Sequence, residues 1–353
     1  MPPATPLDED EVTLTPEMAF QQATERFSAK VDARLEEIIG REEPVENLHD
    51  GLTYALGLDL ADARARGKRI RPVLCLMTAE ALGGDLQQAT NFACAIELMH
   101  NFALVHDDIE DGDEVRRNRP TVWRHYGLAH GINIGDYLFC KVWSTLLEDD
   151  GLGAETRLAL LRLMSETLDH THIGQSLEIT QRANRRFTLE EYFRLVREKT
   201  GFYLAAPMLG GAIVANAPTP VRTTLAKFGE VVGPLFQITD DLLDLTAGKG
   251  RGGKIGSDLR EGKRSYLVAH VTATAPDAEI EHLYDILDKP REQTTDADVA
   301  AALALFEKHG ALEAARAQCD ALLEQALGIL RRLPAPLEGV LSVFARQVAS
   351  RER

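Results

Sequence analysis

Cysteine is scarce in this sequence, and its placement excludes two classes of site. The four cysteines, Cys75, Cys94, Cys140 and Cys319, are scattered, and no two have the spacing of zinc ligands or of a redox pair. A disulfide framework is therefore not expected, and free thiols are typical of a reducing compartment. We expect a cytoplasmic protein.

Positive charge is also scarce. The formal net charge is −16, with 39 Lys and Arg against 55 Asp and Glu, and no long basic stripe is present. Nucleic-acid binding needs many basic side chains to replace the counterions of the phosphates, so we expect no nucleic-acid partner. A smaller polyanion would have to be held locally, and carboxylates that bind a metal ion can create such a site.

The chain lacks a clear export or membrane signal. Its start is acidic, without the basic segment and apolar run of a secretory signal, so residues 1–16 are predicted to form a flexible acidic tail. The uncharged residues 201–221 are long enough to cross a bilayer, but they include three prolines and several small residues. These favour a buried core helix followed by a turn, and no membrane span is expected.

Alternating β-branched residues are rare, and Leu, Ala, Glu and Arg recur at helical spacing. The helices predicted by this spacing cover residues 17–39, 72–82, 86–106, 156–181, 189–215, 221–245 and 298–333. Thr188 and Glu191 have the spacing of a capping box at the start of the fifth. No internal repeat or Ser/Pro-rich linker divides these segments. The sequence therefore predicts an all-α protein with a single domain over residues 17–353.

The pattern Asp-Asp-x-x-Asp occurs twice, at residues 107–111 and 240–244. On a helix, positions i and i+4 share a face, so Asp107 lies beside Asp111 and Asp240 beside Asp244. Like charges at this spacing destabilise a helix by roughly 0.2–0.5 kcal/mol per pair, which suggests a bound cation. A single motif of this kind is equally compatible with a solvated helix face.

Both acidic motifs follow apolar segments, residues 93–105 and 231–239, that are too apolar for surface helices. We therefore expect the aspartates to lie where buried helices emerge into a cavity. Mg²⁺ prefers such hard oxygen ligands and is usually shared between a few carboxylates and the phosphates of a substrate. The pattern favours a metal-bridged diphosphate, and no Ser/His/Asp or Cys/His nucleophile is visible.

Further segments make a family resemblance specific. They are GKRIRP at residues 67–72, the run from Glu97 to Arg117, EKTG at 198–201, FQITDDLLD at 236–244 and GKIGSD at 253–258. In this order they resemble the trans-prenyl diphosphate synthases, over roughly residues 67–264. The resemblance implies the all-α isoprenoid-synthase bundle around a deep central cavity, in a homodimer that joins an allylic diphosphate to isopentenyl diphosphate.

The resemblance also implies roles for single residues. Asp107 and Asp111 would hold two magnesium ions and Asp240 a third. Supporting positions of the metal site would be Asp108, Asp241 and Asp244. Contacts to the allylic diphosphate would come from Arg116, Lys199, Gln237, Lys254 and Lys263. Contacts to isopentenyl diphosphate would come from Lys68, Arg71, His100 and Arg117. Lys199 and Thr200 would flank the allylic cation.

Some of these residues also allow plainer interpretations. A lone histidine on an apolar helix, such as His100, is usually a core residue. Gln237 could serve only to bond backbone groups, and Arg116 and Arg117 could be surface charges. The basic loops at residues 67–72 and 248–256, each taken alone, are compatible with ordinary solvated turns.

Product length in the resembled family depends on bulky residues just before the first acidic motif. Phe102 is aromatic, Ala103 is small, and Met99 would trim the pocket wall. The first motif also lacks the two-residue insertion of bacterial farnesyl-type enzymes. These features resemble the geranylgeranyl type, and farnesyl diphosphate is the alternative product.

Three positions depart from the family pattern. Glu178 stands where GQxxD has aspartate, Asn118 replaces a glycine after the paired arginines, and Arg264-Ser265 follows Lys263 where threonine is usual. Two other functions remain as alternatives. A class I terpene cyclase would share one aspartate motif but would not need Lys68 and Arg71, and a silent partner subunit would usually lose aspartates that this chain retains.

Overall fold

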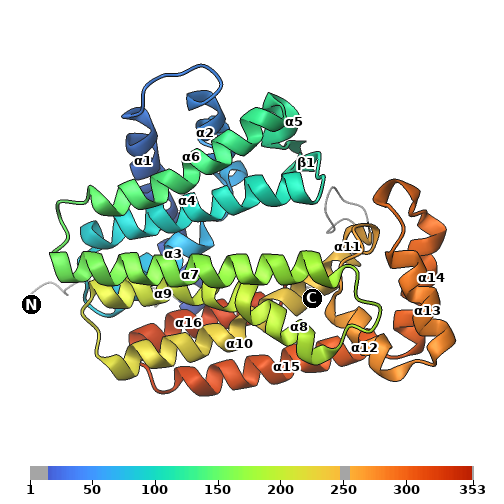
Figure 1. Cartoon of the computed structure of the whole chain (residues 1–353). Coiled ribbons are helices and arrows are strands. Elements are labelled where there is room, and N and C mark those ends of the chain that lie inside the picture. The colour runs from blue at the N-terminus through green and yellow to red at the C-terminus, as the bar shows by residue number, and fades with distance from the viewer. Residues whose placement is uncertain (1–14, 247–254, 352–353) are drawn as a thin grey trace, which may run out of the picture.

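The computed structural model describes residues 15–246 and 255–351 and consists mainly of α-helices (Figure 1). The first half contains α1 (Pro16–Gly40), α2 (His49–Leu56), η1 (Ala63–Arg66), α3 (Ile70–Ala81), α4 (Leu86–Glu110), β1 (Val115–Arg116), β2 (Arg119–Pro120), α5 (Val122–Tyr126), α6 (Leu128–Leu147) and α7 (Ala154–Gln181). The second half contains α8 (Leu189–Val196), η2 (Arg197–Gly201), α9 (Phe202–Val214), α10 (Thr219–Asp244), α11 (Ser257–Arg260), α12 (Tyr266–Thr274), α13 (Asp277–Leu287), η4 (Arg291–Gln293), α14 (Asp296–Lys308), α15 (Ala311–Leu330) and α16 (Ala335–Ala349). The all-α prediction is confirmed.

The interior of the bundle is formed by α3, α4, α9 and α10. α3, α4 and α9 are buried over most of their length, as expected for helices enclosed by others, and α10 is buried mainly over its second half. α4 packs against α3, α6 and α9, and α10 packs against α9 and α15. α7 crosses the front of the bundle, and α13 and α14 extend from one end (Figure 1). This arrangement leaves the C-terminal ends of α4 and α10 at one central region.

The predicted helix over 201–221 is a buried core helix. It is α9, in which Gly211 lies so close to α3 that an added Cβ would be 2.3 Å from the carbonyl oxygen of Cys75. Among the described residues, no helix is long and apolar enough to cross a membrane. The Thr188–Glu191 capping box is present as predicted.

One predicted helix is continuous but contains a π turn, and another is divided in two, so its prediction as one segment was wrong. The segment 189–215 contains a π turn, η2, in which the Phe202 amide donates to the Arg197 carbonyl. The segment 298–333 divides into α14 and α15 at Gly310, whose φ of 64° lies in the left-handed region that favours glycine. The helical spacing also missed α2, α6, α12, α13 and α16.

A short hairpin follows the first acidic motif. β1 pairs with β2, and the two residues of the turn, Arg117 and Asn118, have φ angles of 52° and 61°. A two-residue hairpin turn of this type needs positive φ at both positions, and asparagine tolerates it well. Asn118 therefore fills the conformational role of the glycine that is usual there.

Candidate active site

A cavity of about 240 Å³, partly open to solvent, lies at the centre of the bundle. Its walls come from α3, α4, α7, α8, η2, α9, α10 and the segment from Asp258 to Ser265. Asp107, in the last turn of α4, and Asp240, in the last turn of α10, both line it. The two acidic motifs, separated by more than a hundred residues in sequence, therefore face one space.

The aspartates of the first motif point in different directions. Burial raises the pKa of Asp107, which faces the cavity. Asp111 accepts a hydrogen bond from Arg182 at 2.5 Å and lies 3.4 Å from the Lys263 ammonium. Asp108 instead faces a second, smaller pocket, where Arg116 binds it at 2.6 Å, and burial raises its pKa to about 6.

In the second motif, hydrogen bonds fix the carboxylates of Asp241 and Asp244. Asp241 accepts bonds from the Tyr192 hydroxyl at 3.0 Å, the Tyr266 amide at 3.1 Å and the Gln237 amide group at 3.1 Å. Burial nevertheless raises its pKa to about 7. The Asp244 carboxylate accepts from the backbone amides of residues 257 and 258, so it fixes the start of α11.

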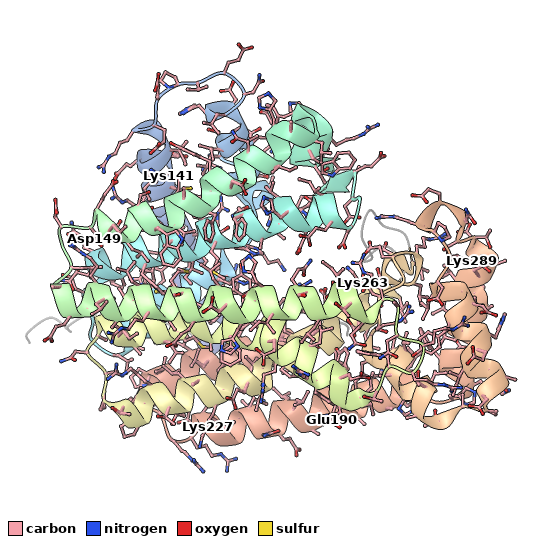
Figure 2. The ribbon with its side chains drawn as sticks, in the orientation of Figure 1. Lys141, Asp149, Glu190, Lys227, Lys263 and Lys289 are labelled. Atoms are coloured by element: carbon pink, nitrogen blue, oxygen red, sulfur yellow. The ribbon has the colours of Figure 1, made fainter. Side chains whose placement is uncertain are left out.

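Two lysines from different elements bring positive charge to the cavity. Lys199, from the π turn, donates to both carboxylate oxygens of Glu178 at 3.0 and 3.1 Å. Burial opposes the charge on Glu178, but Lys199 and Lys263 outweigh it and lower its pKa. Lys263 lies beside α11, near the end of α7 (Figure 2), within 3.4 Å of both Asp111 and Asp258. Lys254 lies outside the described residues.

The residues expected to hold isopentenyl diphosphate are only partly brought together. Arg71 and His100 line the cavity, with 3.4 Å between the Arg71 Nη1 and His100 Nε2 atoms. Arg71 also lies over the Tyr203 ring at 4.4 Å. Burial and the charge of Arg71 lower the pKa of His100 well below its usual value, which keeps the imidazole neutral.

Lys68 and Arg117 lie elsewhere. Lys68 is exposed, and Arg117 lines the second pocket with Arg116 and donates to the Arg66 carbonyl at 2.8 Å. Lys68, Arg116 and Arg117 are therefore not among the described residues that line the central cavity.

One wall of the cavity carries the residues expected to limit product length. Phe102 and Ala103 both line it. The Phe102 ring contacts Phe139 of α6 at 5.2 Å between centroids and His172 of α7 at 5.9 Å. Met99 is completely buried and is not among the described lining residues, so it does not face the cavity directly.

Comparisons with known proteins identify the family of this chain. The sequence profile of the polyprenyl synthetase family matches residues 60–306, which is well over half of the chain. The chain belongs to the polyprenyl synthetase family. It is 36% identical over 254 residues to the short chain isoprenyl diphosphate synthase of Methanothermobacter thermautotrophicus, covering 72% of this chain and 76% of the relative.

Two further matches cover more of the chain. A (2E,6E)-farnesyl diphosphate synthase of Mycobacterium bovis is 34% identical over 293 residues, or 81% of this chain and 80% of the relative. The crystal structure of geranylgeranyl pyrophosphate synthetase from Pyrococcus horikoshii superposes with a TM-score of 0.83 at 32% identity, covering 94% of this chain and 98% of that one. The protein is a prenyltransferase of the polyprenyl synthetase family, which depends on magnesium.

The residues of the cavity fit a shared magnesium site. Within the described parts of the chain, no three acidic, imidazole or thiol groups converge closely enough to hold a metal ion by themselves. Asp107 and Asp240 instead supply separate carboxylates to one cavity that also contains lysines. Mg²⁺ keeps several waters and takes its remaining ligands from phosphate oxygens, so an incomplete protein ligand set is what a polyprenyl synthetase needs.

Several structurally important residues had no signal in the single sequence. Arg182 binds Asp111, Tyr192 binds Asp241, and Arg291 donates at 2.8 Å to Asp113 just after the first motif. These residues belong to different elements, and only the fold brings them to the motifs. Among the departures, Arg264 is buried and lines the edge of the cavity, and its guanidinium donates to main-chain carbonyls.

Proposed function

We propose that this polyprenyl synthetase condenses an allylic diphosphate with isopentenyl diphosphate to form geranylgeranyl diphosphate. The observation that carries the proposal is the shared cavity of Asp107 and Asp240, with Lys199 and Arg71 on its walls. Farnesyl diphosphate is the alternative product.

The diphosphate of the allylic substrate would lie between the two acidic helix ends. Asp107, Asp111 and Asp240 would ligate magnesium, which we propose at three ions, and Asp108, Asp241 and Asp244 would hold the ligands in place. When bound, the metal supplies positive charge that stabilises the departing pyrophosphate. Further contacts to this group would come from Lys199, Gln237, Lys254 and Lys263. Arg116 would join them only by turning away from Asp108 and the second pocket.

The protein's own groups would control the ionisation of the allylic carbon–oxygen bond. Lys199 would stabilise the negative charge on the leaving group, and the dipoles of Thr200 and Gln237 would face the allylic cation. The Thr200 hydroxyl donates to the Gln237 carbonyl oxygen at 3.4 Å, so the two side chains already lie side by side. The apolar part of the cavity would exclude water, which otherwise would trap the cation.

Isopentenyl diphosphate would bind on the side of Arg71 and His100. The positive charge of Arg71 would bind the diphosphate. The neutral imidazole of His100 would offer the diphosphate a hydrogen bond without adding a second charge beside Arg71. Lys68 and Arg117 would complete this site by moving toward the diphosphate. After the double bond attacks the cation, the pyrophosphate is the expected acceptor of the proton.

Product length would be limited by the aromatic wall. Phe102 is supported from behind by Phe139, which is itself 6.0 Å from Trp143, so the ring cannot retreat easily. Ala103 beside it is small, so it leaves room for a longer product chain than a bulky residue at this position would allow. We therefore favour a twenty-carbon product.

The proposed homodimer is supported by apolar side chains exposed on two adjacent helices. On α6 and α7, 44–56% of the surface of these residues is exposed: Leu128, Ile132, Leu147, Leu158, Ile173 and Ile179. Exposed apolar side chains mark an interface where they gather into one patch, so we propose that α6 and α7 contribute to the dimer contact. We further propose a cytoplasmic location, where the thiol Cys140 on the exposed part of α6 stays reduced.

Product analysis tests the proposal. The purified protein is incubated with Mg²⁺, labelled isopentenyl diphosphate and dimethylallyl, geranyl or farnesyl diphosphate in turn, and the chain length is measured by chromatography. We expect a twenty-carbon product that disappears with EDTA. A cyclic hydrocarbon formed without isopentenyl diphosphate would indicate a terpene cyclase, and no turnover would indicate a silent partner subunit.

A further inference from the structure

The π turn that carries Lys199 and Thr200 is attached to α7 by three contacts at regular spacing. At the first, the His170 Nδ1 atom donates to the Glu198 carboxylate at 2.5 Å. At the second, Gly174 lies against the backbone of Lys199. At the third, Glu178 accepts from the Lys199 ammonium. Positions i, i+4 and i+8 lie along one face of a helix, so this face of α7 acts as a continuous support for the turn.

The two residues of the first contact are themselves firmly held. The His170 ring is stacked on the Phe202 ring, with 3.5 Å between centroids and 1° between planes. Glu198 is 9% exposed and also lies 3.5 Å from the Arg197 guanidinium. A carboxylate with so little exposure needs a hydrogen-bond donor, and His170 provides it from a neighbouring helix.

The opposite side of the turn rests on α10. An added Cβ on Gly233 would lie 2.6 Å from the Cα of Gly201, so the two backbones are in direct contact. A π turn contains one more residue than an α turn, and such turns are frequent at functional sites. The turn is therefore held between α7 and α10, and its register decides how far Lys199 and Thr200 reach into the cavity.

We propose that His170 and Glu198 are a positioning pair for Lys199 and Thr200 in the prenyl-transfer reaction. Neither His170 nor Glu198 is among the described residues that line the central cavity. They act by fixing the start of the π turn, so that Lys199 meets the leaving group and Thr200 faces the cation. This inference rests on the roles given to those two residues under the proposed function.

A misplaced π turn would change the products of the reaction, which a loss of folding stability alone would not do. If Lys199 and Thr200 moved, the allylic carbon–oxygen bond could still break, with its electron pair leaving on the diphosphate, but the cation would be less well protected from water. Water then adds to the cation and gives the allylic alcohol, with a proton released to the solvent. The ratio of alcohol to elongated product therefore reports the position of the turn.

The test compares Glu198→Ala, Glu198→Gln and His170→Asn with a control, Glu166→Gln. Glu166 is an exposed carboxylate one turn earlier on α7, with no role in the support. In Glu198→Ala and His170→Asn we expect kcat to fall about tenfold or more, since small misplacements near a reacting centre are costly. The alcohol-to-product ratio should rise severalfold, with the KM for isopentenyl diphosphate nearly unchanged.

Glu198→Gln keeps an acceptor for the His170 N–H group, so its kcat and alcohol ratio should stay close to those of the wild type. The control should match the wild type in both. An unchanged alcohol ratio in Glu198→Ala, or a Gln variant as impaired as the Ala variant, would overturn the inference. Absence of turnover in the wild type would instead contradict the proposed function, so the two failures are distinguishable.

Discussion

Replacing Gly174 by alanine should damage the active site from outside the cavity. A Cβ at this position would lie 2.4 Å from the Lys199 nitrogen, 2.5 Å from its Cα and 2.6 Å from its Cβ. Ordinary contacts begin near 3.4 Å, so α7 and the π turn would have to separate by about 1 Å. None of the three atoms belongs to a flexible side-chain end, and the backbone must therefore move.

The magnitude follows from that displacement. Overpacking of this kind costs about 1–3 kcal/mol in the free energy of unfolding. A 1 Å shift of Lys199 can lower kcat by about a hundredfold. Both are measurable, by urea denaturation and by steady-state kinetics with saturating allylic diphosphate.

Gly328 offers a matched control. It lies inside α15, and an added Cβ there meets no atom within 4 Å. Gly328→Ala should therefore stabilise the protein by up to about 1 kcal/mol, because alanine favours a helix over glycine, without changing kcat. If Gly174→Ala were as stable as the wild type and retained kcat within about twofold, the close contact between α7 and the π turn would be refuted.

Three further predictions concern other parts of the molecule. Phe102→Ala should lengthen the product by one or more isoprene units in chromatographic analysis, and an unchanged product would contradict the assigned cavity wall. Arg69→Met should lower the free energy of unfolding by about 3–5 kcal/mol, because it removes the guanidinium shared by two buried carboxylates and leaves Asp32 with Arg66 and Glu97 with the neutral Asn101. In the same denaturation assay Lys68→Met, at an exposed position, should change the free energy of unfolding by less than about 0.5 kcal/mol. Asp298 is paired with Lys289 and takes part in the capping box of α14, which lowers the pKa of Asp298 to about 2. The ionised carboxylate therefore stabilises the fold fully above its unfolded pKa, and this stabilisation is lost as the pH falls toward 2. Asp298→Asn should lower Tm at pH 7, and a difference in Tm from the wild type that persisted undiminished near pH 2 would contradict this.

The acidic motifs could be predicted from sequence because their signal is local. The i, i+4 spacing of Asp107 and Asp111 follows from helix geometry, and the apolar residues before them indicate a helix that enters the core. The same local logic gave the Thr188–Glu191 cap, which the structure contains. Recognising that two such helix ends share one cavity required several motifs in one order, because no single motif contains that information.

Other features could not be predicted because they depend on contacts between distant elements. Arg69 turns into the core while Arg71, two positions later, faces the cavity, and both lie in one basic segment. Asp108 faces away from the cavity although it lies beside Asp107. The π turn over Arg197–Gly201 has no marker in its own residues, since Gly174 and Gly233 on two other helices shape it.

The central claim is that the two acidic helix ends act together on one metal-bound diphosphate. Isothermal titration calorimetry with a non-reactive allylic diphosphate analogue and Mg²⁺ tests it directly, on the wild type, Asp107→Asn, Asp240→Asn and the double variant. We predict a coupling energy above about 1 kcal/mol between the two substitutions, because both would act on the same bound group. Losses of affinity that simply add, within about 0.5 kcal/mol, would contradict the account.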